Sequence, residues 1–248
     1  MTLKRKRKQQ MELNLQKANK YACLADLAYK DNEAVEDYKK HGYTHHVFLD
    51  NDGAQCHIVW NDSEIALCFR GTQPEELSDV LADLNALPRK SMTDGWVHRG
   101  FRGELDKLWP AVQRHVNEHA DKTLYVCGHS LGAAMATICT SRIEEFRKVE
   151  ELYTFGSPRA GTRSFVKAIE TTHWRFVNNN DLVTGVPLAL MGYKHHGNLV
   201  YINHYGKIRK MTLWQRIKDK VRGLRDGVLD GAKDHSMKNY VKYTIVEG

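Results

Sequence analysis

The stretch Leu124-Tyr125-Val126-Cys127-Gly128-His129-Ser130-Leu131-Gly132-Ala133-Ala134-Met135-Ala136 is the strongest indication of the fold. Its opening residues are apolar or small, as in a buried strand, and its closing residues are small residues at helical spacing. Between them lies a G-x-S-x-G pentapeptide, typical of a strained strand-to-helix turn that presents a serine hydroxyl at the top of a sheet. The two glycines suit a place where strand and helix backbones approach too closely for a side chain. We therefore predict that Ser130 is a nucleophile.

Composition indicates an ordinary soluble globular chain. The 248 residues suit one large domain or two small ones, with 42% hydrophobic and 27% charged residues. The net charge is +7, and the basic excess lies mainly at 4–8 and 207–242. No helix-turn-helix, zinc-finger or RNA-binding signature accompanies it, so no nucleic-acid partner is expected. Attraction to an anionic lipid surface or a solvated tail explains the charge equally well.

Cysteine usage and the first residues bear on the compartment. The five cysteines are widely spaced, with no C-x-x-C and no Cys/His grouping recognised as having zinc spacing, which favours a reducing compartment over a disulfide framework. The basic run near Met1 has no apolar segment of a Sec-type signal after it, and no stretch reaches the length of a membrane span. We expect a cytoplasmic location, or export by a route without a Sec signal peptide.

Strand-like and helix-like segments alternate along the chain, which predicts a largely parallel sheet covered on both faces. Ligand chemistry then belongs at the carboxyl ends of the strands, where Thr72, Ser130 and Asp181 lie. The predicted helices are about Gln9–Lys30, 101–119 and Arg163–Glu170, and the predicted strands besides the opening stretch are Tyr43–Leu49, Ala54–Trp60, Glu64–Phe69, Leu152–Phe155, Trp174–Val177 and Leu199–Asn203.

A nucleophilic serine needs a histidine base and a carboxylate that orients it, in the chain order Ser, Asp or Glu, His for this type of turn. Asp181 follows a strand through an Asn run, although an Asx turn or a helix N-cap would also use an aspartate there. Among the later histidines we favour His235, which lies after the last strand and close to the C-terminus, with His195 as the main alternative. We expect His98 and His129 to have packing and hydrogen-bonding roles.

Five motifs occur in the order seen in the class 3 lipase family, which the chain resembles from about Ile65 to Tyr240. They are Phe69-Arg70-Gly71-Thr72, Val97-His98-Arg99-Gly100-Phe101, Gly128-His129-Ser130-Leu131-Gly132, Thr154-Phe155-Gly156-Ser157-Pro158-Arg159 and Asn180-Asp181. The resemblance implies an α/β-hydrolase fold, with a mostly parallel central sheet covered by helices on both faces. It also implies serine-dependent hydrolysis of lipid esters.

Carried over by position, the resemblance implies a catalytic triad and an oxyanion hole. Ser130 is the implied nucleophile, Asp181 the acid and His235 the base. Thr72 and the backbone N–H of Leu131 are the implied oxyanion donors. No metal or organic cofactor is implied.

One segment differs from the usual family pattern, and two others have an unusual composition for their place in the chain. In place of a tryptophan-bearing lid helix, residues 73–81 form a short polar lid-like segment. Residues 211–233 form an amphipathic basic helical insertion, which either packs on the core as a surface helix or meets anionic lipid and roofs the acyl pocket. The apolar segment Val186–Tyr193 either lines an acyl groove or packs inside. The substrate-binding candidates are Leu77, Val186, Leu188, Leu190 and Trp214.

We therefore expect a single α/β-hydrolase domain over residues 1–248, with a basic tail at 1–8. The expected activity is that of a triacylglycerol lipase or esterase acting on a lipid ester through an acyl-enzyme. The alternatives are a phospholipase A1 acting on anionic membranes and, third, a non-catalytic lipid-binding protein on the same fold. Peripheral contact with an anionic lipid surface is expected, and the sequence does not indicate an oligomeric state.

Overall fold

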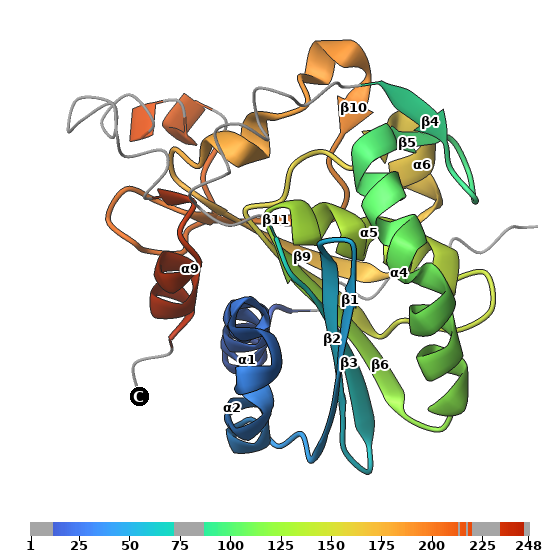
Figure 1. Cartoon of the computed structure of the whole chain (residues 1–248). Helices are drawn as coiled ribbons and strands as arrows, with labels where there is room; N and C mark the ends of the chain where they lie inside the picture. Colours follow the sequence, from blue (N-terminus) through green and yellow to red (C-terminus); the bar gives the residue numbers. More distant parts are fainter. Residues whose placement is uncertain (1–11, 72–86, 213, 217, 220–233, 246–248) are drawn as a thin grey trace, which may run out of the picture.

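A seven-stranded, mostly parallel sheet forms the centre of the described residues, which are 12–71, 87–212, 214–216, 218–219 and 234–245 of a computed structural model (Figure 1). In sheet order the strands are β1 (His45–Asn51), β2 (Ala54–Trp60), β3 (Glu64–Phe69), β6 (Thr123–His129), β7 (Glu151–Phe155), β9 (Thr172–Asn178) and β11 (Asn198–Ile202). β1, β2 and β3 pair antiparallel, and every pairing from β3 to β11 is parallel. The parallel sheet predicted from the alternating pattern is confirmed.

Helices cover both faces of this sheet, as predicted (Figure 1). One face carries α1 (Leu15–Leu27), the 3-10 helix η1 (Ala28–Ala34), α2 (Val35–Lys40) and α9 (Met237–Thr244). The other carries α4 (Arg99–Glu118), α5 (Leu131–Ile143) and α6 (Arg163–Ala168). Successive side chains of β6 point to opposite faces of the sheet, so this strand contributes to the hydrophobic core on each face. Leu124 and Val126 pack under α4 and α5, whereas Tyr125 and Cys127 pack under α1.

The long helix α4 forms because its apolar residues recur at helical spacing. Its buried side chains are Phe101, Leu105, Leu108, Val112 and Val116. At its start, the His98 side chain accepts a hydrogen bond from the N–H of Phe101 at 3.3 Å, which satisfies one of the free amides of the first turn. α5 is buried along nearly its whole surface, which explains its run of alanines.

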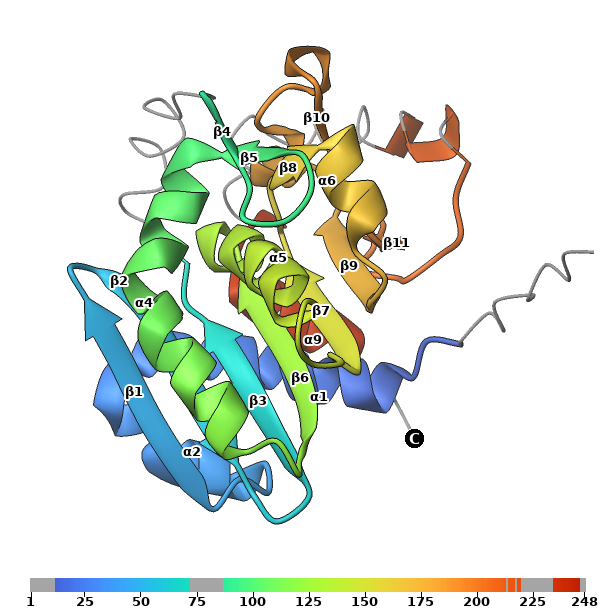
Figure 2. The ribbon, with the colours of Figure 1, turned by 90° about the vertical axis from the view of Figure 1, so that its right-hand side faces the viewer.

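A second, smaller sheet lies beyond the carboxyl ends of the central strands (Figure 2). Its order is β10 (Tyr193–Lys194), β8 (Gly161–Thr162), β5 (Trp96–His98) and β4 (Pro88–Lys90). The connection before β10 contains the 3-10 helices η2 (Leu182–Gly185) and η3 (Ala189–Met191). Strands of two or three residues carry no hydrophobic period, and the sequence did not predict this sheet.

The first helix is shorter than the predicted Gln9–Lys30. Asn14 caps it by accepting from the N–H of Lys17 at 2.9 Å, and it gives way to η1 after Leu27. Within η1, Asp31 takes a positive φ of 48°, which breaks the helical path. Asn19 ties α1 to α9 by donating to the carbonyl of Val241 at 3.0 Å.

All five cysteines are free thiols, and four of them are buried. Burial raises the pKa of Cys139 to about 12, so that this thiol stays protonated. The buried cysteines pack as small apolar side chains. Among the described helices, none has the length and hydrophobicity that crossing a bilayer requires.

Candidate active site

Ser130 sits at the turn between β6 and α5, in a conformation that few residues adopt. Its φ and ψ are 56° and −130°, a region that costs about 1–3 kcal/mol for a residue with a side chain. The flanking glycines make the turn feasible: a Cβ on Gly128 would lie 2.6 Å from the carbonyl oxygen of Gly132, and a Cβ on Gly132 would lie 2.6 Å from the carbonyl carbon of Arg70. The sequence therefore forms the predicted elbow.

Asp181 and His235 meet at the carboxyl edge of the sheet although they lie 54 residues apart. Nδ1 of His235 is 2.9 Å from each carboxylate oxygen of Asp181, and both side chains are buried. Oδ1 of Asp181 also accepts from the N–H of Val183 at 3.0 Å, so the capping role weighed from the sequence coexists with the contact to histidine. Since a carboxylate only accepts, Nδ1 of His235 donates and Nε2 carries the lone pair.

Gly156, directly after β7, leaves the space that this pair occupies. Its φ is +59°, and a Cβ there would lie 2.7 Å from Oδ2 of Asp181 and 2.8 Å from Nδ1 of His235. The Gly-Ser-Pro motif contains this glycine, but only the fold shows that it faces Asp181 and His235.

Tyr240 of α9 is a further contact of Asp181, and sequence reasoning missed it. Its hydroxyl donates to Oδ2 of Asp181 at 2.5 Å and accepts from the N–H of Asn178 at 3.0 Å. Burial and the neighbouring Asp181 charge raise the pKa of Tyr240 well above its usual range, so the phenol stays a donor. A tyrosine on the helix that follows His235 is the only signal available in the sequence.

His129 packs against His235, which agrees with its expected packing role. Its ring stacks on His235 with centroids 4.5 Å apart, and its Nε2 lies 2.8 Å from the His235 carbonyl oxygen. Burial, with a smaller effect from His235, lowers the pKa of His129 well below its usual range. A neutral ring that donates from Nε2 must accept at Nδ1, so Tyr29 donates its hydroxyl there at 2.7 Å.

Two polar atoms at this edge of the sheet are buried and make no hydrogen bond with the described residues: Oγ of Ser130 and Nε2 of His235. Buried polar atoms are ordinarily paired, and these two belong to the side chains predicted as nucleophile and base. Gly71 packs against the elbow, since a Cβ on it would lie 2.8 Å from Cβ of Ser130.

Of the two residues predicted to donate to an oxyanion, the described part of the chain contains Leu131 but not Thr72. Leu131 is the first residue of α5, where a backbone N–H has no partner inside the helix and points out of its positive end. Thr72 lies outside the described residues, as do Leu77, the tail at 1–8 and the lid-like segment 73–81.

His195, the alternative candidate for the base, is hydrogen-bonded to a backbone carbonyl and not to Asp181. Nε2 of His195 lies 3.0 Å from the carbonyl oxygen of Thr184, to which it donates. Burial, reinforced by the nearby charges of Arg175 and Arg159, lowers the pKa of His195 well below its usual range. The structure thus brings His235, and not His195, to the carboxylate of Asp181.

The candidate lipid-contacting residues lie largely at the surface. Leu190 is 98% exposed and Leu188 58%, while Val186 is half-buried. The alternative in which this segment packs inside is therefore wrong for its leucines. Arg159 holds the segment in place, since its N–H donates to the carbonyl of Val186 at 2.8 Å. Of the predicted insertion 211–233, residues 214–216 and 218–219 are described as helical, and Trp214 is 64% exposed.

Known proteins resemble this chain in sequence and in fold. The model of the family described as lipase (class 3) matches residues 66–191, just over half of the chain. Toxin TseL of Vibrio cholerae is 30% identical in an alignment of 185 positions that covers 57% of this chain and 29% of the toxin. The secreted mono- and diacylglycerol lipase MDL2 of Malassezia globosa is 27% identical over 76% of this chain and 69% of its own. The chain thus spans less than a third of the toxin's length.

A solved structure extends the likeness to most of the chain. The crystal structure of a mutant form of MDLA from Penicillium cyclopium superposes with a TM-score of 0.69, at 20% identity, over 90% of this chain and 96% of that one. The fold is accordingly the α/β-hydrolase fold, as predicted.

Proposed function

The chain belongs to the class 3 lipase family, and we propose on that premise that it is a serine hydrolase that cleaves carboxylic esters of lipids. The observation that carries the proposal is the contact of Nδ1 of His235 with both oxygens of Asp181 at 2.9 Å, on the edge where the strained Ser130 lies. A carboxylate that orients a neutral imidazole leaves its Nε2 ready to take a proton, which is what a weak serine nucleophile needs.

In the proposed reaction, Nε2 of His235 takes the hydroxyl proton as Oγ of Ser130 attacks the ester carbonyl carbon. Asp181 stabilises the imidazolium that forms, while Tyr240 keeps one oxygen of that carboxylate occupied. The imidazolium then protonates the leaving alcohol, and an acyl-enzyme remains. Water, deprotonated by the same imidazole, attacks the acyl carbon and releases the fatty acid and the free serine.

The developing negative charge on the carbonyl oxygen needs donors that are already in place. The N–H of Leu131 at the positive end of α5 suits that role, with Thr72 as the second donor by its place in the family motif. A single donor of this kind is worth about 3–4 kcal/mol of transition-state stabilisation.

A fluorophosphonate probe tests the assignment directly, because it labels only an activated serine. The wild-type chain should be labelled and should release p-nitrophenol from p-nitrophenyl butyrate. Ser130→Ala should do neither, while the matched variant Ser164→Ala, at an exposed position, should behave as wild type. Labelling that persists in Ser130→Ala would refute the proposal.

A basic cavity favours a second candidate, a phospholipase A1 acting on anionic membranes. It has a volume of about 480 Å³, and its lining includes Lys207, Arg209 and Lys210. Asp219, the acidic residue among its described lining residues, already accepts from the Tyr201 hydroxyl at 3.0 Å. The Tyr201 hydroxyl also lies 3.3 Å from Oδ1 of Asn179, two residues before Asp181. A phosphate headgroup suits such a lining.

Rates on triolein and on dioleoyl phosphatidylglycerol decide between the two candidates. A phospholipase should prefer the anionic lipid and lose that preference in Lys207→Gln/Arg209→Gln, with the rate on p-nitrophenyl butyrate unchanged. Trp214→Glu should lower co-sedimentation with phosphatidylglycerol vesicles if this face meets the membrane. Equal binding of the vesicles by wild type and Trp214→Glu would show that this face does not meet the membrane.

A further inference from the structure

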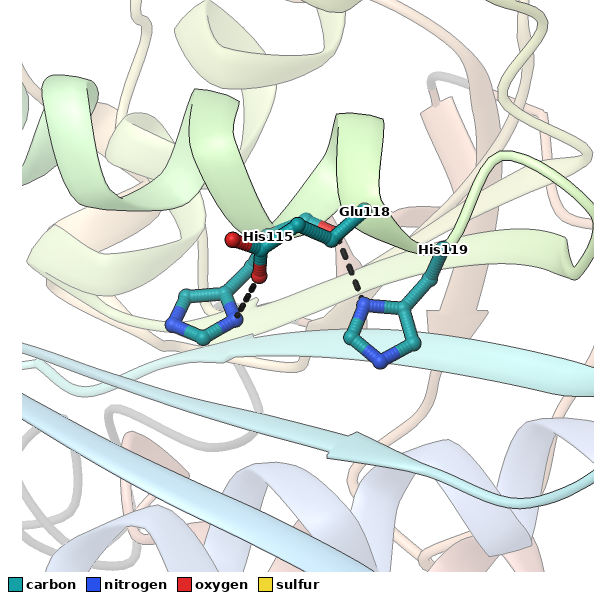
Figure 3. Close-up of side chains that lie close together, drawn as sticks. All are labelled: His115, Glu118 and His119. Atoms are coloured by element: carbon teal, nitrogen blue, oxygen red, sulfur yellow. Dashed lines mark hydrogen bonds and ion pairs between the residues drawn. The ribbon is translucent and has the colours of Figure 1, made fainter.

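Three side chains at the carboxyl-terminal end of α4 form a cluster that the ester hydrolase chemistry does not use. His115, Glu118 and His119 each offer one ligand atom, and these atoms lie within 4.8 Å of one another. Figure 3 shows the three side chains at the last turn, with both imidazoles directed toward the sheet. We propose that this cluster is a binding site for a divalent transition metal, with Zn²⁺ as the best-suited ion.

The spacing of the residues places them on one side of the helix. Positions i, i+3 and i+4 are neighbours on a helical surface, and His115-Val116-Asn117-Glu118-His119 has the H-x-x-E-H pattern whose histidines bind zinc in one class of metalloenzyme. No Cys/His grouping with zinc spacing was expected from the sequence, and this pattern differs in combining two histidines with a glutamate and no cysteine.

The ligand set fits zinc in kind, and its ligand atoms, which lie within 4.8 Å of one another, must draw together around the ion. Two imidazoles and a carboxylate are ordinary zinc ligands with bonds of about 2.0–2.2 Å, so ligand atoms around a tetrahedral ion lie roughly 3.4 Å apart. Oε2 of Glu118 already lies 3.3 Å from Nδ1 of His115. The Glu118 side chain is 51% exposed, so it is free to rotate and complete the site, with water as a further ligand.

Two features of the surroundings favour a cation here. The carbonyl groups at the end of α4 give the helix a partial negative charge, which stabilises positive charge within the last turn. Glu118 adds a full negative charge that is only loosely engaged, since Nε of Arg114 lies 3.8 Å away.

His119 is held as a ligating histidine usually is. Its Nδ1 donates to the carbonyl oxygen of His115 at 2.9 Å, which leaves the lone pair on Nε2. Trp60 packs against its ring with centroids 4.5 Å apart. A hydrogen bond from one ring nitrogen to a carbonyl, which fixes the tautomer and orients the ring, is the usual support of a zinc ligand.

The site lies far from the proposed triad. α4 ends at Glu118 and β6 begins at Thr123, whereas Ser130 follows the other end of that seven-residue strand. At about 3.3 Å per residue, the two sites are roughly 20 Å apart. A bound ion would therefore brace the turn between α4 and β6 and would leave ester hydrolysis unaffected.

Isothermal titration of the metal-free full chain with ZnCl₂ tests the proposal. We expect one ion per chain with a micromolar dissociation constant. Glu118→Gln and His119→Gln should each weaken binding at least tenfold, and the matched variants Glu145→Gln and His41→Gln should bind as wild type. Zinc should also raise the melting temperature of wild type but not of His119→Gln.

Binding of equal strength by His119→Gln would overturn the proposal. So would loss of binding in His196→Gln alone or in His46→Gln alone. Nδ1 of His196 lies 3.0 Å from Nδ1 of His173, and Nε2 of His46 lies 2.8 Å from Nδ1 of His57, so either pair could attract the ion. Fluorophosphonate labelling of each variant separates this test from that of the proposed hydrolase, since labelling should be the same in all of them.

Discussion

Gly156→Ala should separate the integrity of the proposed triad from the stability of the fold. The new methyl would lie 2.7 Å from Oδ2 of Asp181 and 2.8 Å from Nδ1 of His235, whereas unstrained contacts lie near 3.5 Å or beyond. The pair must therefore separate or shift by about 0.7–0.8 Å. A misplacement near 1 Å costs about 10²-fold in rate, which corresponds to roughly 2.7 kcal/mol.

The substitution also carries a backbone cost, which a second glycine isolates. Gly156 has a φ of +59°, and Gly42 has a φ of +87° with nothing within 4 Å of an added Cβ. Either alanine should lower the free energy of unfolding by about 1–2 kcal/mol. Only Gly156→Ala should also lose activity, because Gly42 lies in the turn before β1, away from the site.

The assay is steady-state hydrolysis of p-nitrophenyl butyrate beside urea unfolding of the same samples. We expect kcat/KM of Gly156→Ala to fall about 10²-fold and that of Gly42→Ala to stay at the wild-type value. Activity of Gly156→Ala within about threefold of wild type would refute the placement of Asp181 and His235 against this glycine. An equal loss in Gly42→Ala would attribute the effect to stability.

Three further predictions rest on single contacts. Tyr240→Phe removes a hydrogen bond to a charged carboxylate, so unfolding should cost about 1.5–3 kcal/mol less and kcat should fall with KM unchanged; wild-type kcat would show that Asp181 does not depend on it. Burial lowers the pKa of His57 to about 3, so its neutral form stabilises the fold fully above about pH 6.5, and this contribution is lost as the pH falls toward 3. His57→Phe should therefore reduce the loss of unfolding free energy between pH 7.5 and 5.5 by about 1.4 kcal/mol, and an unchanged loss in urea titrations would contradict this. Leu190→Glu, at a side chain 98% exposed, should leave unfolding within about 0.5 kcal/mol but weaken adsorption to triolein droplets; undiminished adsorption would exclude Leu190 from the lipid-binding surface.

The sequence predicted best what short-range patterns determine. The strand Glu64–Phe69 was predicted to the residue because Ile65–Phe69 are all apolar and polar turns bound the strand. The elbow was predicted because its glycines report a steric requirement between adjacent elements. Asp181 and the order of the motifs could also be predicted from the sequence, since each motif lies at the end of a strand or shortly after it.

What the sequence could not supply depends on contacts between distant segments. The choice of His235 over His195 requires knowing which loop reaches Asp181, and the roles of Gly156 and Tyr240 require the same knowledge. The exposure of Leu190 was equally out of reach, because an apolar run reads the same whether it faces the core or the solvent. The roles proposed for Thr72 and Leu77 stay predictions.

The pairing of α1 with α9 has a consequence for how the chain acquires its shape during synthesis. Asn19 donates to the Val241 carbonyl at 3.0 Å and to Oγ1 of Thr244 at 2.9 Å, across more than 220 residues. At about 5–20 residues per second on the ribosome, the first helix waits roughly 10–45 s for that partner. His235 lies just before α9, so it is synthesised at almost the same time as that partner. A nascent chain therefore gains the proposed base His235 and the helix α9 together, so the proposed hydrolase activity should arise only after α9 has been synthesised.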